Sequence, residues 1–105
     1  MTVDPSTDLS VQPVGGGVVK VVGELDIRTC EGLELVVGEL IGGGGTLVLD
    51  LSGLSFCDST GLAALVRLHK RTTAAGGTLV LRAPVERVRN LLSLTGLVRL
   101  FVVEP

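Results

Sequence analysis

The sequence lacks most of the residue types on which nucleic-acid-binding domains and many enzymes depend. Its 105 residues contain no tryptophan, no tyrosine, two phenylalanines and one histidine. Few aromatic side chains are available to stack on bases, and a formal net charge of −2 gives no basic surface for a phosphate backbone. The composition therefore argues against nucleic-acid binding.

Metal ligands and long apolar runs are also scarce. Cys30 and Cys57 do not form a CxxC pair, and His69 alone cannot complete a four-ligand zinc site with them. The apolar runs are much shorter than the roughly 20 residues that a bilayer requires. The amino terminus has no basic region followed by an apolar stretch, so it does not resemble a signal peptide. We expect no metal, no cofactor, no membrane contact and a cytoplasmic location.

Aliphatic residues and glycine are abundant instead. Hydrophobic residues make up 46% of the chain, and glycine occurs 15 times. Domains commonly run roughly 100–150 residues, and this apolar content is enough for a core. We expect a single domain over residues 1–105, in which residues 1–8 form a loose amino-terminal tail.

Apolar periodicity predicts strands and helices in alternation. Two β-branched stretches around Gly15-Gly16-Gly17 predict a hairpin, whose second strand ends at Gly23. Apolar residues that recur every three or four positions predict three helices, and Asp26 or Thr29 is suited to cap the first. These helices are expected at about 30–41, 59–75 and 84–95. Further strands are expected at 46–51, 78–82 and 100–103. The order ββαβαβαβ predicts an α/β fold, a mixed β-sheet with helices packed on it.

The motif GGTLVL occurs twice, at 44–49 and at 76–81. The spacing is close to the roughly 30 residues of one βαβ unit, and two copies are too few for a solenoid. We therefore expect two parallel strands in equivalent positions, joined by the second helix. The first of them is almost wholly apolar, which is typical of a strand covered on both faces.

The sequence lacks the residues or the motifs that most catalytic sites require. His69 lies more than two helical turns from Ser59, so a Ser–His–Asp site is not indicated. No GxxxxGK[ST] or GxGxxG motif occurs, and the glycines at 42–45 precede a strand rather than a helix. An enzyme with Asp50 and Asp58 as acid and base is the weakest alternative.

The segment FCDSTGL at 56–62 is the remaining candidate for function. It includes the end of a loop predicted at 52–57 and joins the carboxyl end of the buried strand to the start of the second helix, at the edge of an α/β sheet where binding sites collect. Ser59 lies at or next to the helix amino cap, where capping alone would explain a serine. A phosphate there would carry roughly −1.5 to −2 charge, which the helix terminus tolerates. A partner pressed against it would meet a new anion beside Asp58, so Ser59 could switch binding without unfolding the protein.

These residues resemble the anti-sigma-factor antagonists of the STAS domain family. The resemblance covers nearly the whole chain and is carried mainly by GELD at 23–26, LDLS at 49–52 and FCDSTGL at 56–62. Cys57 departs from the pattern, because a larger apolar residue is usual there. The resemblance implies that Ser59 is the phosphorylated residue. It also implies a partner-binding surface made of Asp26, Asp58, Ser59, Thr60 and Gly61.

The resemblance further implies a partner-switching cycle. The unphosphorylated protein binds an anti-sigma factor with serine kinase activity and so releases the sigma factor. Phosphorylation at Ser59 inactivates the antagonist, and a metal-dependent phosphatase of the PPM type restores it. The antagonist itself is then not an enzyme. The alternative is a STAS scaffold or ligand-binding module in a sensory or transport complex, without phosphorylation.

Overall fold

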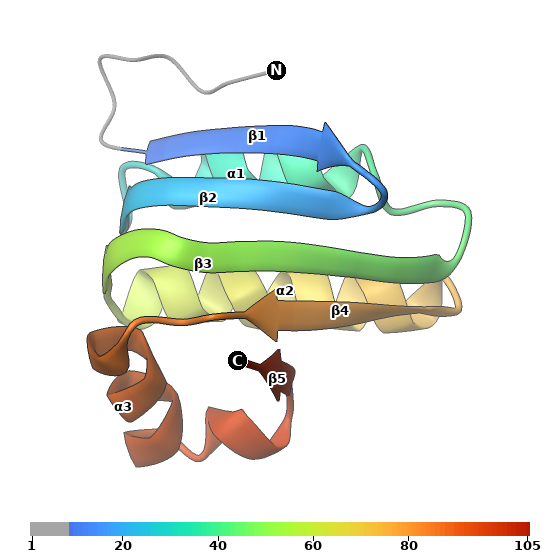
Figure 1. Ribbon diagram of the computed structural model, residues 1–105. Coiled ribbons are helices and arrows are strands. Elements are labelled where there is room, and N and C mark those ends of the chain that lie inside the picture. The colour runs from blue at the N-terminus through green and yellow to red at the C-terminus, as the bar shows by residue number, and fades with distance from the viewer. Residues whose placement is uncertain (1–8) are drawn as a thin grey trace.

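Five strands form one mixed sheet, and three helices pack on it (Figure 1). The computed structural model describes residues 9–105, so the predicted tail at 1–8 lies outside the described residues. The strands are β1 (Leu9–Gly15), β2 (Val18–Leu25), β3 (Gly45–Cys57), β4 (Gly77–Arg82) and β5 (Val102–Glu104). The helices are α1 (Cys30–Gly38), α2 (Ser59–Ala74) and α3 (Glu86–Leu94), followed by a short 3-10 helix, η1 (Leu97–Arg99). The predicted order ββαβαβαβ is confirmed.

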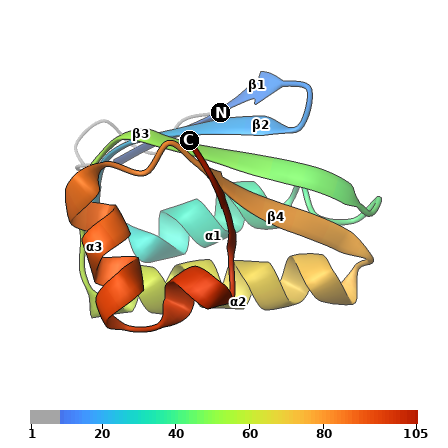
Figure 2. The same cartoon turned by 60° about the horizontal axis from the view of Figure 1, so that its bottom comes forward.

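All three helices lie on the same face of the sheet. The strand order is β1-β2-β3-β4-β5; β1 and β2 are antiparallel, and every later pair is parallel. Each parallel crossover therefore moves one strand further in the same direction, and right-handed crossovers then place every helix on one side. Figure 2 shows α1, α2 and α3 together beneath the sheet. Among residues 9–105, no helix covers the opposite face, which we call the open face.

The prediction that β3 is covered on both faces is therefore wrong. Leu47 and Leu49 point into the core beneath the sheet, whereas Val48 points to the open face. Val48 is still only 9% exposed, because Val18 and Val80 flank it on the neighbouring strands. Val48 is therefore buried by its neighbours within the sheet and not by a second layer of helices.

The repeated GGTLVL motif is confirmed as a pair of equivalent parallel strands. Residues 45–49 of β3 lie in register beside residues 77–81 of β4. No side chain fits where the two strands begin, since a Cβ on Gly77 would overlap the carbonyl oxygen of Gly45. A side chain at Gly77 would therefore push the strands apart.

The core fills the space between the sheet and the helices. It consists mainly of leucine and valine, including the fully buried Leu25, Leu33, Leu49, Leu65 and Leu81. At its surface the Arg67 guanidinium of α2 makes a two-pronged ion pair with Glu34 of α1, with both contacts at 2.8 Å. The Glu34 pKa is lowered by this hydrogen-bonded partner.

Two strands run further than the sequence predicts. β3 continues through the loop expected at 52–57, where Leu54 and Cys57 are buried. Two register shifts, between Asp50 and Gly53 and between Leu54 and Phe56, keep these two side chains facing the core. β2 continues past Gly23, which has φ +120° within the strand, to Leu25. These extensions bring the carboxyl ends of the two strands side by side, with Leu25 paired to Cys57.

The carboxyl-terminal part differs slightly from prediction. The last strand is Val102–Glu104 and follows η1, so residues 100 and 101 are not part of it. No helix of residues 9–105 is long and apolar enough to cross a membrane.

Candidate functional site

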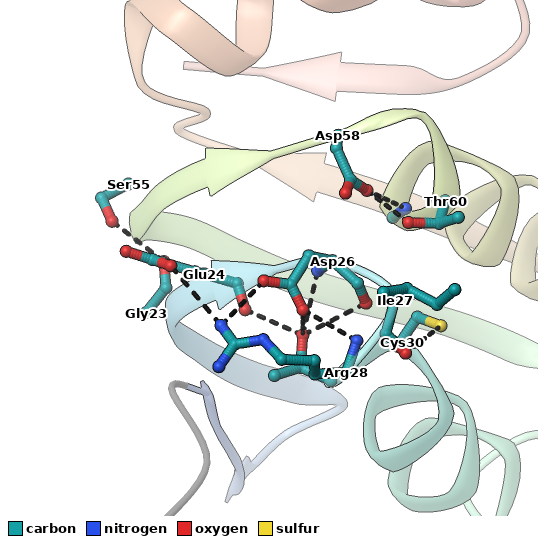
Figure 3. Close-up of polar contacts among 11 residues, drawn as sticks. Gly23, Glu24, Asp26, Ile27, Arg28, Cys30, Ser55, Asp58 and Thr60 are labelled. Atoms are coloured by element: carbon teal, nitrogen blue, oxygen red, sulfur yellow. Dashed lines mark hydrogen bonds and ion pairs between the residues drawn. The ribbon is translucent and has the colours of Figure 1, made fainter.

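The candidate site forms where β2 and β3 end together. The Asp58 N–H donates a hydrogen bond of 3.2 Å to the carbonyl oxygen of Leu25, the last residue of β2. The turn that follows β2 and the start of α2 therefore lie next to each other, as Figure 3 shows for Asp26 and Asp58. The structure thus brings the predicted site residues from two distant parts of the chain to one edge of the sheet.

Gly61 permits this close approach. It is buried in the first turn of α2, and a Cβ there would lie 2.7 Å from the Leu25 carbonyl oxygen and 2.9 Å from the Cys57 sulfur. Both distances are shorter than a carbon atom tolerates. Only glycine lets the amino terminus of α2 rest directly on the end of β2. Gly61 therefore positions the site from beneath rather than offering a contact surface.

Asp58 is the amino cap of α2. Its backbone is extended, with φ −106° and ψ −172°, and its Oδ1 accepts a hydrogen bond of 2.9 Å from the Gly61 N–H. The same oxygen accepts a bond of 2.5 Å from the Thr60 hydroxyl. An aspartate in this place satisfies an otherwise unpaired N–H and places negative charge at the positive end of the helix. The capping role considered for Ser59 therefore belongs to Asp58.

Ser59 is the first residue of α2 and is exposed. Its hydroxyl has no hydrogen-bond partner among residues 9–105, in contrast to the neighbouring hydroxyl of Thr60, which is half-buried and bonded to Asp58. The backbone N–H groups of Ser59 and Thr60 also have no acceptor in this part of the chain. An unpaired hydroxyl thus stands beside unpaired donors at a helix amino terminus, which is a favourable place for an added anion.

Asp26 lies on the turn between β2 and α1 and is held there by local contacts. Its carboxylate accepts hydrogen bonds of 2.9 Å from the Arg28 backbone N–H and from the Arg28 guanidinium. The Arg28 guanidinium bond is the main cause that lowers the Asp26 pKa. Thr29 is the amino-cap residue of α1, as expected, but its hydroxyl does not bond to the helix: it donates to the Glu24 carbonyl oxygen at 2.8 Å and accepts the Asp26 N–H at 3.0 Å. The Asp26 side chain is therefore a fixed anion at the rim of the site, partly neutralised by Arg28.

The groups considered for catalysis are not assembled into a site. Asp50 lies on the open face, and residues 51–57 separate it from Asp58 by roughly 26 Å along the chain, at about 3.3 Å per residue. His69 packs edge-on against Phe101, with 5.5 Å between ring centroids. Burial raises the pKa of the Cys57 thiol to about 12, so the thiol stays protonated and is a poor nucleophile.

A groove beside the site was not predicted. It has a volume of about 580 Å³ and lies between the end of β3 and α3. Phe56, Leu91 and Leu94 form its apolar part, and the Arg87 guanidinium lies 6.0 Å from the centre of the Phe56 ring. Leu94 is 85% exposed, which is unusual for so large an apolar side chain. Phe56 belongs to the candidate segment at 56–62. The groove residues on α3 are distant from it in sequence, and no sequence motif marked them as part of the site.

Comparison with known proteins places this geometry in a known family. The STAS domain family matches residues 9–105. The anti-sigma-B factor antagonist of Bacillus subtilis is 34% identical over 79 residues, which is 75% of this chain and 72% of that protein.

Solved structures agree with that match. An anti-sigma factor antagonist from Mycobacterium paratuberculosis is 32% identical, with a TM-score of 0.73 over 97% of this chain and 89% of that one. The anti-sigma factor antagonist SpoIIAA in its unphosphorylated form is 24% identical, with a TM-score of 0.72 over 90% and 86%. At 24% identity, the similarity to SpoIIAA shows a shared fold only.

Proposed function

The chain belongs to the STAS domain family and resembles its anti-sigma factor antagonists, and we propose that it is an antagonist switched by phosphorylation of Ser59. In its unphosphorylated form it binds an anti-sigma factor with serine kinase activity, and the sigma factor is released. Transfer of a phosphoryl group from ATP to the Ser59 hydroxyl oxygen yields ADP and ends the binding. A PPM-type phosphatase hydrolyses the phosphoserine and restores the protein.

One observation carries the proposal: Ser59 is the exposed, unbonded hydroxyl at the site. A kinase needs an acceptor oxygen that it can reach and that has no competing hydrogen bond. Thr60 fails on both counts, since it is half-buried and donates to Asp58. Ser59 meets both conditions within residues 9–105.

The role of Asp58 explains why the switch leaves the fold intact. Because Asp58 caps α2, the helix start does not depend on the Ser59 hydroxyl. A phosphate on Ser59 lies at the positive end of the helix dipole, and the unpaired N–H groups of the first turn can face it. The modification therefore alters the surface without removing a bond that holds the fold.

The same phosphate is unfavourable for a bound partner. It adds roughly −1.5 to −2 charge next to Asp58 and near Asp26, which takes the net charge of the chain from −2 to about −4. A partner that covers this rim must desolvate the new anion. The exposed side chain of Ile27, with 72% of its surface accessible, lies on the same turn as Asp26 and supplies apolar contact area.

The test is phosphate transfer with each candidate anti-sigma kinase and ATP, followed by mass-spectrometric mapping. We expect one phosphate per chain, located on Ser59, and none on Ser59→Ala. Ser93→Ala is the matched control, because Ser93 is also an exposed helical serine but lies on α3. It should accept phosphate at the wild-type rate.

Two outcomes would overturn the proposal. Phosphate on another residue while Ser59 stays unmodified removes the switch. A kinase that binds the protein tightly and never modifies it favours the alternative, a STAS scaffold that acts without phosphorylation.

A further inference from the structure

The open face of the sheet carries a row of four charged side chains with alternating sign. Residues that are in register on neighbouring parallel strands point to the same face and lie about 4.8 Å apart. The pairings across β2, β3, β4 and β5 join one charged residue to the next in a single line. In order across the sheet, they are Lys20, Asp50, Arg82 and Glu104.

Contacts within the chain show that these charges interact. The Arg82 guanidinium contacts the Glu104 carboxylate at 2.6 Å. The Ser52 N–H, 3.0 Å from Asp50, is the main cause that lowers the Asp50 pKa, and the charges of Lys20 and Arg82 lower it further. Asp50 is therefore ionised at neutral pH, and the row reads plus, minus, plus, minus.

A row of valines runs beside the charged row. Two residues earlier along each strand, the same pairings align one valine from every strand. In order across the sheet, they are Val18, Val48, Val80 and Val102. Val102 is 50% exposed and Val18 is half-buried, whereas Val48 and Val80 in the middle are only 9% and 7% exposed. Figure 1 looks onto this face, with α1 and α2 behind the sheet. The apolar surface of the row is therefore offered mainly at its two ends, at Val18 and Val102, whereas its centre is flat and buried.

The order of charges makes the row complementary to itself. Consider two copies stacked with their open faces together and related by a twofold axis parallel to the strands, between β3 and β4. β2 of one copy then lies over β5 of the other, and β3 lies over β4. Lys20 meets Glu104 of the second copy, and Asp50 meets Arg82 of the second copy. All four contacts join opposite charges, and the two valine rows meet each other.

Neighbouring registers are disfavoured by the same pattern. If the axis shifts by half a strand spacing onto β3, Asp50 lies over Asp50 of the second copy and Lys20 lies over Arg82. Every contact of the row then joins like charges, which is costly when the charges are desolvated. The alternation therefore disfavours shifts of half a strand spacing, and the axis between β3 and β4 is the one that opposes all four charges of each copy to unlike charges. The exposed ends of the valine row add apolar contact.

We propose that this protein forms a twofold-symmetric homodimer through its open sheet face, with the charged row of each copy opposed in reverse order to that of the other. Aligned sheets pack face to face at about 10 Å, and an isologous contact of this kind closes with two copies. The helices lie on the outer sides, so the dimer leaves Ser59 accessible. Because the axis is parallel to the strands, both Ser59 sites lie at the same end of the dimer.

Charge reversal with reciprocal rescue tests the proposal without any partner protein. The mass in solution is measured by light scattering and sedimentation at up to about 1 mM, where even weak association is detected. The wild type should have twice the 10.8 kDa mass of the chain. Asp50→Arg alone and Arg82→Asp alone should each be monomeric, because each places like charges at the centre of the interface. An equal mixture of the two variants should form a heterodimer, because every opposed pair is then again of opposite sign.

Controls separate the interface from the fold. Glu39→Arg makes the same kind of change on an exposed residue at the end of α1, and it should remain dimeric. Circular dichroism should show that both single variants keep the wild-type fold. A monomeric wild type overturns the proposal, as does a dimer that survives Asp50→Arg. Single variants that are folded and monomeric but do not pair with each other overturn the proposed register.

Discussion

At the amino end of the parallel sheet the loops before β3 and β4 are rich in glycine, whereas the segments after the carboxyl ends of β2 and β3 contain aspartate, serine and threonine. The loops before β3 and β4 contain the glycines at 42–45 and 76–77. The segments after β2 and β3 contain Asp26, Asp58 and Ser59. At each end there is nevertheless a glycine where a Cβ would overlap backbone atoms: Gly77, and also Gly17, at the first, and Gly61 at the second.

The comparison separates two uses of close backbone approach. At Gly77 the approach joins two strands and brings no reactive group to the surface. At Gly61 it seats the start of α2 on β2 and so places Asp58 beside the Asp26 turn. Glycine therefore supports the fold at both ends, and only the polar residues at the carboxyl end make that end a candidate site.

The largest stability effect is expected from adding a methyl group at either close approach. Gly61→Ala and Gly77→Ala should each lower the free energy of unfolding by about 1–3 kcal/mol, because the new Cβ overlaps backbone atoms. Phosphate uptake by Ser59 should fall strongly in Gly61→Ala and remain at the wild-type rate in Gly77→Ala. Urea denaturation and kinase assays below the unfolding transition measure the two effects. Equal loss of phosphate uptake in both variants would break the comparison between the two ends.

Removal of the helix cap should have a moderate effect. Asp58→Ala leaves the Gly61 N–H without its acceptor and should cost about 1 kcal/mol of stability. Asp58→Asn keeps an acceptor oxygen and serves as the matched control, with a much smaller loss. Urea denaturation of the wild type and both variants under the same conditions measures these differences in stability. Identical stability of Asp58→Ala and the wild type would mean that Asp58 does not cap α2.

A change of opposite sign is expected in the glycine loop at the amino end. Gly43 has open space where a Cβ would be added and does not require a positive φ, in contrast to Gly44 at +71°. Gly43→Ala should therefore stabilise the protein by about 0.4–1 kcal/mol through a less flexible unfolded chain, whereas Gly44→Ala should destabilise it. Thermal unfolding compares the two. A stabilised Gly44→Ala would contradict the assigned backbone.

The smallest effect concerns the Asp26–Arg28 pair at the carboxyl end. The Asp26 pKa is lowered in the folded protein by its bond to Arg28, so the pair stabilises the fold above the unfolded pKa of about 4. That stabilisation is lost as the pH falls through the lower, folded pKa. The stability difference between wild type and Arg28→Ala should therefore be greater at pH 7 than at pH 2. Urea denaturation at both values checks this, and a difference that grows on acidification would contradict the assignment.

The elements and the parallel register followed from local sequence, but several boundaries did not. GGTLVL repeated at a βαβ spacing predicted the β3–β4 pair correctly, since register there depends on two matching strands. The extension of β3 through 52–57 was missed because a bulge near Gly53 breaks the alternation that marks a strand. The strand past Gly23 was missed because a glycine, with no side chain to pack, weakens the strand pattern at that position.

The sequence named residues that the structure brings together at this edge of the sheet, but it did not predict the contacts that each of them makes. Asp58, Ser59 and Thr60 are adjacent in sequence, yet only the geometry separates a cap, an unbonded hydroxyl and a bonded one. The charged row of the open face could not be predicted at all. Neighbouring residues of the row lie 22 to 32 positions apart in the sequence, and only the strand register places them in line.

The central claim is that one phosphate on Ser59 changes binding and leaves the fold unchanged. The direct test measures, on phosphorylated and unphosphorylated samples of the same preparation, both the affinity for the anti-sigma kinase and the free energy of unfolding. The account predicts an affinity weakened by about tenfold or more, equivalent to at least about 1.4 kcal/mol, with the free energy of unfolding unchanged within about 0.5 kcal/mol. Equal affinity of the two samples, or loss of binding explained by unfolding, would contradict it.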